Sequence, residues 1–398
     1  MATPLDLNAP ARGAPTPDGL ALWQLGFRPF YLLASAFASL SIALWAAQYA
    51  GWLTHPYLDG PMWHAHEMIF GYTLAVIAGF LLTAVRNWTG RPTPAGAALM
   101  ALAALWVAGR VLLLTPLAVA AAAVDVLFPV ALALGLGVPL LSSGNRRNYV
   151  FIGLLLAMAA LDLTEHLARQ GVIALPERYA VQAALDVILL IMTVMGGRVI
   201  PMFTSNGVRG AQPRRSAVIE GLAPASAVAL LVADLLQLPA WGLIAVLALG
   251  AIVQGARVWL WRPWQTLRVP IVWVLHAGYL WIPVHLLLRA LGEAGTLPLP
   301  VATHALTVGA IGMMTLGMMT RTARGHSGRA LTADRHEVAA YALVGLAAIT
   351  RVVVPLVAMQ VYREAVIASA CMWSAAFAIY AIRYWPVLTR PRIDGKPG

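Results

Sequence analysis

The chain has 398 residues, of which 60% are hydrophobic and 11% are charged, and its formal net charge is +11. With a mean hydropathy of +0.76, this composition excludes an ordinary soluble domain and is typical of a polytopic membrane protein. Its single cysteine, Cys371, excludes an internal disulfide and a thiolate cluster. Any metal would therefore be held mainly by His, Met or carboxylate side chains.

Residues 1–27 are rich in Pro, Ala and Gly and lack the basic start and apolar core of a signal peptide. We expect a flexible cytoplasmic tail there, a twelve-helix transmembrane domain over residues 28–387, and a second cytoplasmic tail over residues 388–398. Each span is predicted from an apolar run long enough to cross about 30 Å of hydrocarbon. The predicted limits are 29–50, 63–85, 95–114, 117–141, 149–170, 178–203, 217–236, 240–260, 269–291, 301–320, 338–358 and 364–385.

Arginines gather in alternate loops, beginning with Arg86 and Arg91, whereas the loop 51–62 between the first two spans has none. By the positive-inside rule both termini are cytoplasmic, and the basic excess reports topology rather than binding to nucleic acid. We therefore expect a multi-pass protein of the cytoplasmic (inner) membrane, surrounded by the lipid bilayer. In this topology the spans 63–85 and 301–320 both run from the outside to the inside.

Two predicted spans begin in the same way. His66 precedes an apolar run, and His304 opens another; superposing the two histidines without gaps aligns Gly71 with Gly309. The cluster Trp63–Met68 places two imidazoles and a carboxylate where the hydrocarbon begins, which is costly unless they have a function. We expect these two helix mouths to form the functional site, on the outer side of the membrane.

Ionisable side chains also occur inside other spans, where each costs roughly 2.5–3.5 kcal/mol on insertion scales. Asp162, Glu165 and His166 share one face of the span 149–170, since they are spaced by three and four residues. Interhelical ion pairs are the alternative for any single residue, but concentration in the outer leaflet favours a polar site. The other members are Asp125, Asp186, Arg110 and Arg351.

Histidine is the usual nitrogen ligand for copper, zinc and haem iron. We rank His66 and His304 first as metal or haem ligands, with a hydrogen-bonded structural role as the alternative for any lone intramembrane histidine. His64 and His66 are two residues apart, roughly 200° around a helix, so this spacing predicts different partners. The remaining candidate metal ligands are His64, His166, His285 and His276.

Carboxylates close to these histidines could orient the imidazoles or carry protons. The candidates are Glu67, Asp162 and Glu165. Arg198 and Arg351 are candidates for contacting a cofactor together with His66 and His304. Arg198 lies in a segment with Pro201 that predicts either a broken helix lining a cavity or, as we favour, a helix end with its arginine at the interface.

Four stretches of the sequence belong together in a characteristic order: 26–33, 63–71, 197–204, and 304–309 continuing through 321–329. In these stretches the sequence resembles the NnrS family, the haem-copper membrane proteins of the nitric oxide response. The resemblance implies a twelve-helix protein containing haem, taken as haem b, and copper, with a role in denitrification and resistance to nitrosative stress. It supplies no ligand map.

We therefore predict a haem- and copper-binding protein that metabolises nitric oxide or protects against it, with its metal site in the outer half of the bundle. If it is an enzyme, it is an oxidoreductase acting on nitric oxide, with quinol or another donor supplying electrons. The alternative is a secondary transporter that binds substrate or protons at its intramembrane acids and histidines.

Overall fold

The computed structural model describes residues 21–53, 57–176 and 178–396. Most of the tail predicted for residues 1–27, and residues 397–398 of the other tail, lie outside these ranges. The described part is helical and contains no strand. Its elements are η1 (Ala21–Trp23), α1 (Phe27–Tyr49), α2 (Gly60–His66), η2 (Glu67–Thr73), α3 (Leu74–Thr89), α4 (Ala97–Leu112), α5 (Ala118–Ser142), η3 (Arg146–Asn148), α6 (Val150–Arg169), α7 (Tyr179–Gly207), α8 (Ala217–Leu235), α9 (Ala240–Leu260), η4 (Pro263–Thr266), α10 (Pro270–Glu293), α11 (Leu299–His304), η5 (Ala305–Gly312), α12 (Met313–His326), α13 (Arg335–Val357), η6 (Met359–Val361) and α14 (Tyr362–Thr389).

The prediction of a polytopic all-α membrane protein is confirmed. Eleven helical segments of the described chain are long and apolar enough to cross a membrane, and the shorter apolar helix α4 corresponds to the predicted span 95–114. Large apolar side chains such as Leu134, Val138 and Ile252 remain exposed on the outside of the bundle. Such side chains suit contact with lipid rather than water.

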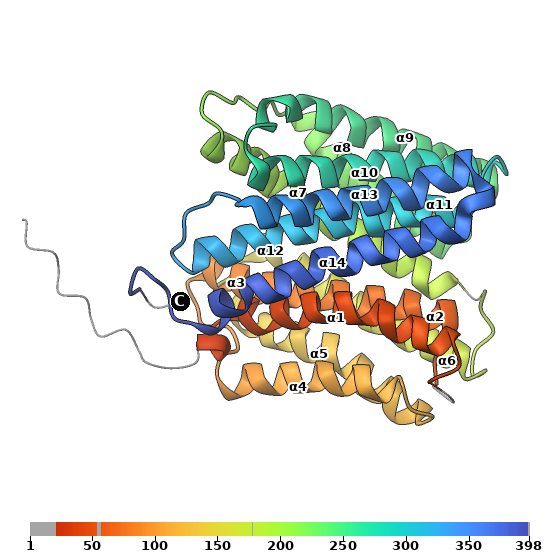
Figure 1. Ribbon diagram of the computed structural model, residues 1–398, viewed down its shortest axis with the longest axis horizontal. Helices are drawn as coiled ribbons and strands as arrows, with labels where there is room; N and C mark the ends of the chain where they lie inside the picture. Colours follow the sequence, from red (N-terminus) through yellow and green to blue (C-terminus); the bar gives the residue numbers. More distant parts are fainter. Residues whose placement is uncertain (1–20, 54–56, 177, 397–398) are drawn as a thin grey trace, which may run out of the picture.

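The helices run roughly parallel to one another (Figure 1). α8, α9 and α10 pack on one side and α4, α5 and α6 on the other, while α1, α13 and α14 pack together between them. Two spans, Gly60–Thr89 and Tyr179–Gly207, are the most enclosed, with 83% of the most apolar stretch of each buried. Both ends of the described chain lie at the left of Figure 1.

Two spans share an unusual local structure. In the second span, α2 ends at His66 and is followed by the π-helix η2; in the tenth, α11 ends at His304 and is followed by the π-helix η5. The two aligned glycines, Gly71 and Gly309, both fall inside these π-helices. The two helix mouths are therefore alike in their backbone as well as in their sequence. π-helical turns are rare and concentrate at functional sites.

Helix α7 is continuous from Tyr179 to Gly207 and contains Pro201. The segment around Arg198 is therefore not a broken helix. The structure is closer to the interpretation in which an arginine on an intact helix reaches toward the membrane interface.

Candidate metal centre

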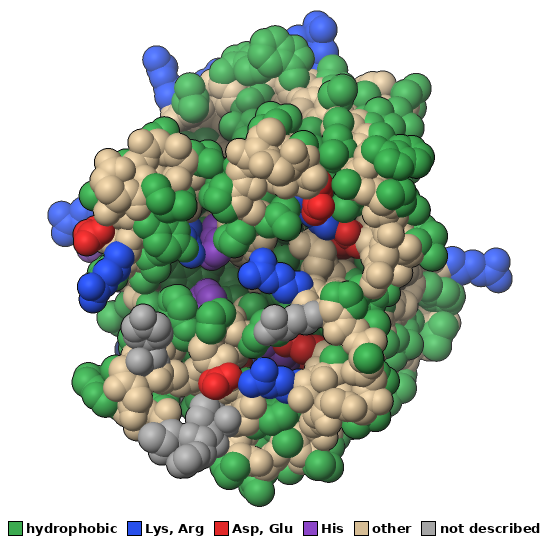
Figure 2. All heavy atoms as spheres, turned by 90° about the vertical axis from the view of Figure 1, so that its right-hand side faces the viewer, with side chains coloured by type: hydrophobic (Ala, Val, Ile, Leu, Met, Phe, Trp, Pro, Cys, Tyr) green, Lys and Arg blue, Asp and Glu red, His purple; other side chains and the backbone are tan. Residues whose placement is uncertain are grey.

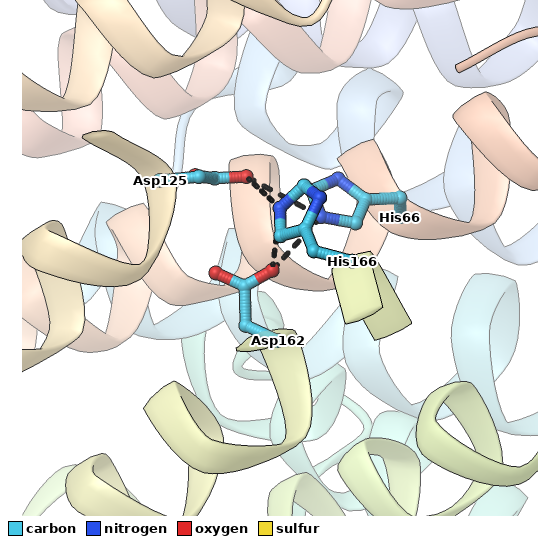
Figure 3. Close-up of side chains that lie close together, drawn as sticks. All are labelled: His66, Asp125, Asp162 and His166. Carbon is cyan, nitrogen blue, oxygen red and sulfur yellow. Dashed lines mark hydrogen bonds and ion pairs between the residues drawn. The ribbon is translucent and has the colours of Figure 1, made fainter. Parts of the chain in front are cut away.

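Four buried side chains from three spans meet in the half of the bundle that holds α2 (Figure 3). His66 is the last residue of α2, Asp125 comes from α5, and Asp162 and His166 come from α6. One ligand atom from each of the four lies within 4.8 Å of every other. Asp162 and His166 share a helix face because they are four residues apart, as the spacing predicts.

The distances within this cluster bracket those between ligands of one metal ion. Nε2 of His66 lies 3.0 Å from Oδ1 of Asp162 and 3.3 Å from Oδ2 of Asp125. Nε2 of His166 lies 3.3 Å from Oδ1 of Asp162 and 3.8 Å from Oδ2 of Asp125. Metal–ligand bonds of about 2.0–2.2 Å give separations of roughly 3.3–3.6 Å in a tetrahedral site. The cluster therefore has the size and donor types of a metal coordination sphere.

Arg110 of α4 connects this cluster to Glu67. Its Nη1 donates to Oε2 of Glu67 at 2.8 Å, and its Nη2 donates to Oδ1 of Asp125. Helix α4 can approach α5 closely at this level because Gly109 faces Asp125, whose Cα would lie 3.7 Å from an added Cβ. The arginine thus occupies one oxygen of Asp125 and leaves the other facing the two imidazoles.

Tyr57 orients His166 from outside the cluster. Its hydroxyl lies 3.3 Å from the backbone oxygen of His166, to which it can donate, and 3.2 Å from Nδ1, from which it can accept. When the hydroxyl donates to that backbone oxygen, Nδ1 carries the imidazole proton, and the lone pair of Nε2 would be free to bind a metal ion. A ligating histidine with its second nitrogen held in this way is the usual arrangement at metal sites.

The cluster and its surroundings contain more negative than positive charge. The carboxylates of Glu67, Asp125, Asp162 and Glu165 are all buried, and Arg110 pairs with only two of them, Glu67 and Asp125. Neither carboxylate oxygen of Glu165 has a hydrogen-bond partner among the described residues. Since uncompensated charge inside a membrane costs several kcal/mol, the group requires additional positive charge, from a metal cation or from protons.

A second histidine group lies at the other helix mouth. His64 stacks on Trp45, with ring centroids 4.7 Å apart, rather than pointing at the cluster around His66. His64 and Arg351 both lie within electrostatic range of His304. Figure 2 looks onto this end of the bundle and shows histidine side chains in a hollow, with basic side chains beside it. The two histidines of the Trp63–Met68 segment therefore face different partners, as their spacing predicts.

The sequence model described as NnrS protein matches residues 21–392. The chain belongs to the NnrS family. A search among curated proteins found no match to the sequence.

The structure divides the predicted ligands of this NnrS-family chain among several places. Nδ1 of His285 donates to the backbone oxygen of Ala302 at 2.8 Å, near the second histidine group. His276 lies apart, with Nε2 2.7 Å from the hydroxyl of Thr204. Arg198 donates to Asn148 at the end of the bundle that is distant from His66.

Two residues of this NnrS-family chain contribute to the cluster or its surroundings although the sequence did not predict them as site residues. Asp125 was identified only as an intramembrane acid, yet it contributes to the four-residue cluster. Arg110 was identified only as an intramembrane cation, yet it joins Asp125 to Glu67. The signal for both was their charge inside an apolar span. Hydropathy alone cannot show which residue on another helix each one faces.

Proposed function

We propose that this NnrS-family protein of the cytoplasmic membrane binds copper and haem and acts on nitric oxide. The observation that carries this proposal is the four-residue cluster with ligand spacing, buried in a membrane bundle with excess negative charge. His66, His166, Asp125 and Asp162 supply only nitrogen and oxygen donors. Among divalent first-row metals such a donor set binds Cu²⁺ most tightly, by the Irving–Williams order.

The second histidine group fits a haem. Nδ1 of His304 donates to the backbone oxygen of Pro300 at 2.6 Å, which leaves Nε2 with a free lone pair. Membrane haem iron is typically held by such histidines, and His64 on the facing span is the second candidate ligand. The Arg351 guanidinium would pair with the acidic groups of haem. Bound haem would supply one-electron chemistry with nitric oxide.

The protein's own residues have distinct roles in this proposal. Tyr57 orients His166, and the Glu67–Arg110 pair fixes the position of Asp125. Glu165, buried beside the cluster, would hold or pass the protons that reduction of nitric oxide consumes. The enclosing helices exclude bulk water, which strengthens every charge interaction within the site. Electrons would come from quinol or another donor.

Metal and haem contents of the purified full-length protein test this proposal. We expect copper by elemental analysis and a Soret band by absorption. His66→Ala should lower copper without abolishing haem, and His304→Ala should lower haem without abolishing copper. His336→Ala, which removes a partly exposed histidine near the start of α13, is the matched control. A protein with neither copper nor a Soret band would refute the assignment.

Nitric oxide consumption in the presence of an electron donor then separates two forms of the proposal. Consumption far beyond the amount of protein supports an oxidoreductase, whereas stoichiometric consumption supports sequestration.

The secondary transporter remains the second candidate, because protons on the imidazoles would compensate the same negative charge. Metal-free protein that takes up protons with a substrate would favour it.

A further inference from the structure

A second polar feature lies at the end of the bundle opposite the metal cluster. A cavity of about 400 Å³ is lined by Trp88, Asn145, Arg147, Asn148, Arg198 and Arg215. Trp88 follows His66 by 22 residues in the same span, which corresponds to roughly 30 Å along the helix. The cavity therefore cannot be part of the proposed copper site. It lies at the arginine-rich end that the positive-inside rule assigns to the cytoplasm.

The wall of this cavity is held by a chain of hydrogen bonds. Nη1 of Arg198 donates to Oδ1 of Asn148 at 2.6 Å, and Nδ2 of Asn148 donates to Oδ1 of Asn145 at 3.0 Å. Nδ2 of Asn145 then donates to the backbone oxygen of Trp88 at 3.1 Å. Asn148 is only 5% exposed. The loop between α5 and α6 is thus tied to α3 and α7 in one surface.

The guanidinium of Arg198 is also positioned by an aromatic ring. It lies over Phe151, 5.7 Å from the ring centroid, and Trp88 stacks on the same ring at 5.6 Å. Arginine held between an amide acceptor and an aromatic face keeps its remaining N–H donors directed outward. The Arg198 side chain has therefore already lost conformational freedom before any ligand binds, so binding need not pay this entropic cost again.

The charges around the cavity are not balanced by carboxylates. Arg215 pairs with Glu220 at 3.2 Å, and Glu220 is shared with Arg257. For Arg147 and Arg198, the part of the chain that the structure describes contains no ion pair with a carboxylate. The positive-inside rule explains why arginines lie at this end. It does not explain why they converge on a cavity with fixed amide groups.

We propose that this cavity binds a phosphate ester, with Arg147 and Arg198 contacting the phosphate oxygens and Trp88 covering one side. The planar fork of donors in arginine matches the oxygens of phosphate. Basic pockets between transmembrane helices at the cytoplasmic face bind the head groups of anionic lipids. The phosphate could therefore belong to a phospholipid of the inner leaflet or to a soluble compound. This site is separate from the proposed nitric oxide chemistry.

The test uses full-length protein in detergent and two probes. Native mass spectrometry measures binding of phosphatidylglycerol against phosphatidylcholine, and calorimetry measures binding of inorganic pyrophosphate. The variants are Arg147→Gln and Arg198→Gln. Arg146→Gln is the matched control, because it removes a neighbouring arginine that does not line the cavity. Thermal unfolding in detergent serves as a check that each variant is folded.

We expect phosphatidylglycerol to bind in preference to phosphatidylcholine. Each test variant should weaken the binding of phosphatidylglycerol about fivefold, which is the effect of one basic residue near an anionic surface. Arg146→Gln should leave it unchanged. If only pyrophosphate shows this pattern, the site is supported with a soluble ligand. Equal binding of both probes to wild type and Arg147→Gln would overturn the proposal. Arg147 projects from an exposed loop, so its loss should not prevent folding even if that of Arg198 does.

Discussion

Nε2 of His66 lies 3.0 Å from Oδ1 of Asp162, although 96 residues separate them in the chain. The same carboxylate oxygen lies 3.3 Å from Nε2 of His166. One oxygen thus faces two imidazole nitrogens in a region from which water is excluded. A metal cation shared by all three groups, or protons on the two imidazoles, would account for this arrangement. Asp162 is therefore a first choice for substitution.

Asp162→Asn keeps the size of the side chain and removes its charge. We expect copper affinity to fall by at least the 10–100-fold that is typical even for groups outside the ligand set. Competition with a chelator of known affinity measures this loss. Asp59→Asn is the control, since Asp59 is 67% exposed and pairs with Arg169 at the surface. If a chelator removes copper equally well from the Asp162→Asn variant and from wild type, that result would argue against Asp162 as a copper ligand.

Arg110→Ala should destabilise the protein strongly. Removing it leaves the carboxylates of Glu67 and Asp125 buried without their partner, and breaking a buried pair costs about 3–5 kcal/mol. Thermal unfolding in detergent measures the change. Arg169→Ala breaks an exposed pair instead and should cost about 0–1 kcal/mol. Similar unfolding temperatures for the two variants would show that Arg110 is not the compensating charge.

Tyr57→Phe should weaken copper binding while leaving the fold intact. The substitution removes the hydroxyl that holds Nδ1 of His166, so the ring loses its fixed orientation. We expect a 10–100-fold loss of affinity, measured by chelator competition. Tyr179→Phe removes a hydroxyl that donates to the backbone oxygen of Leu235 and should have no effect on copper. Unchanged affinity after Tyr57→Phe would remove this tyrosine from the site.

Gly71→Ala should disturb the site through sterics alone. An added Cβ would lie 2.6 Å from Nη1 of Arg110 and 2.9 Å from Cε1 of Phe37, so the arginine must move. We expect lower copper affinity and lower thermal stability. Gly153→Ala is the matched control in α6, because its Cβ would meet no atom within 4 Å and alanine favours the helix by about 1 kcal/mol. A neutral Gly71→Ala would contradict the tight packing there.

Acidification should loosen the start of α13. Partial burial raises the pKa of Asp334, but hydrogen bonds from the backbone N–H groups of His336 and Glu337, and from Arg383, outweigh this and hold the pKa below its ordinary value. Its stabilising effect is therefore complete above the ordinary pKa near 4 and is lost as the pH falls through the lowered value. Hydrogen exchange of the first turn of α13 should rise in that range.

Substitution of the same residue provides the check on that pH dependence. Asp334→Ala should raise exchange in the first turn at all pH values, since losing an N-cap costs about 1 kcal/mol. Asp334→Asn keeps a capping oxygen and should remove only the pH dependence. If wild type and Asp334→Asn respond alike to acid, another group is responsible.

The spans could be predicted from the sequence because a membrane helix is dictated locally, by about 20 consecutive apolar residues. All twelve predicted runs coincide with helical segments, including the short α4. The face shared by Asp162 and His166 was also predictable, because both residues belong to one helix. The separation of His64 from His66 follows from the same periodicity.

The pairing of Asp125 with these residues could not be predicted in the same way. It depends on the axial and rotational setting of α5 against α2 and α6, which is determined by side-chain packing between helices. Arg110 and Glu67 are likewise meaningful only as a pair across two helices. The π-helices were not predictable either, since apolar periodicity does not reveal a single wider turn.

The π-helix after His66 has an evolutionary consequence. A π-helical turn holds one residue more than the α-helical turn it replaces. Deleting one residue between Glu67 and Thr73 would restore a regular helix and leave His66 facing nearly the same way relative to α3, because the narrower turn still covers 360°. The packing of α3 would be unaffected. A one-codon insertion could thus have created each wider turn without rebuilding the bundle, in η2 and likewise in η5 after His304.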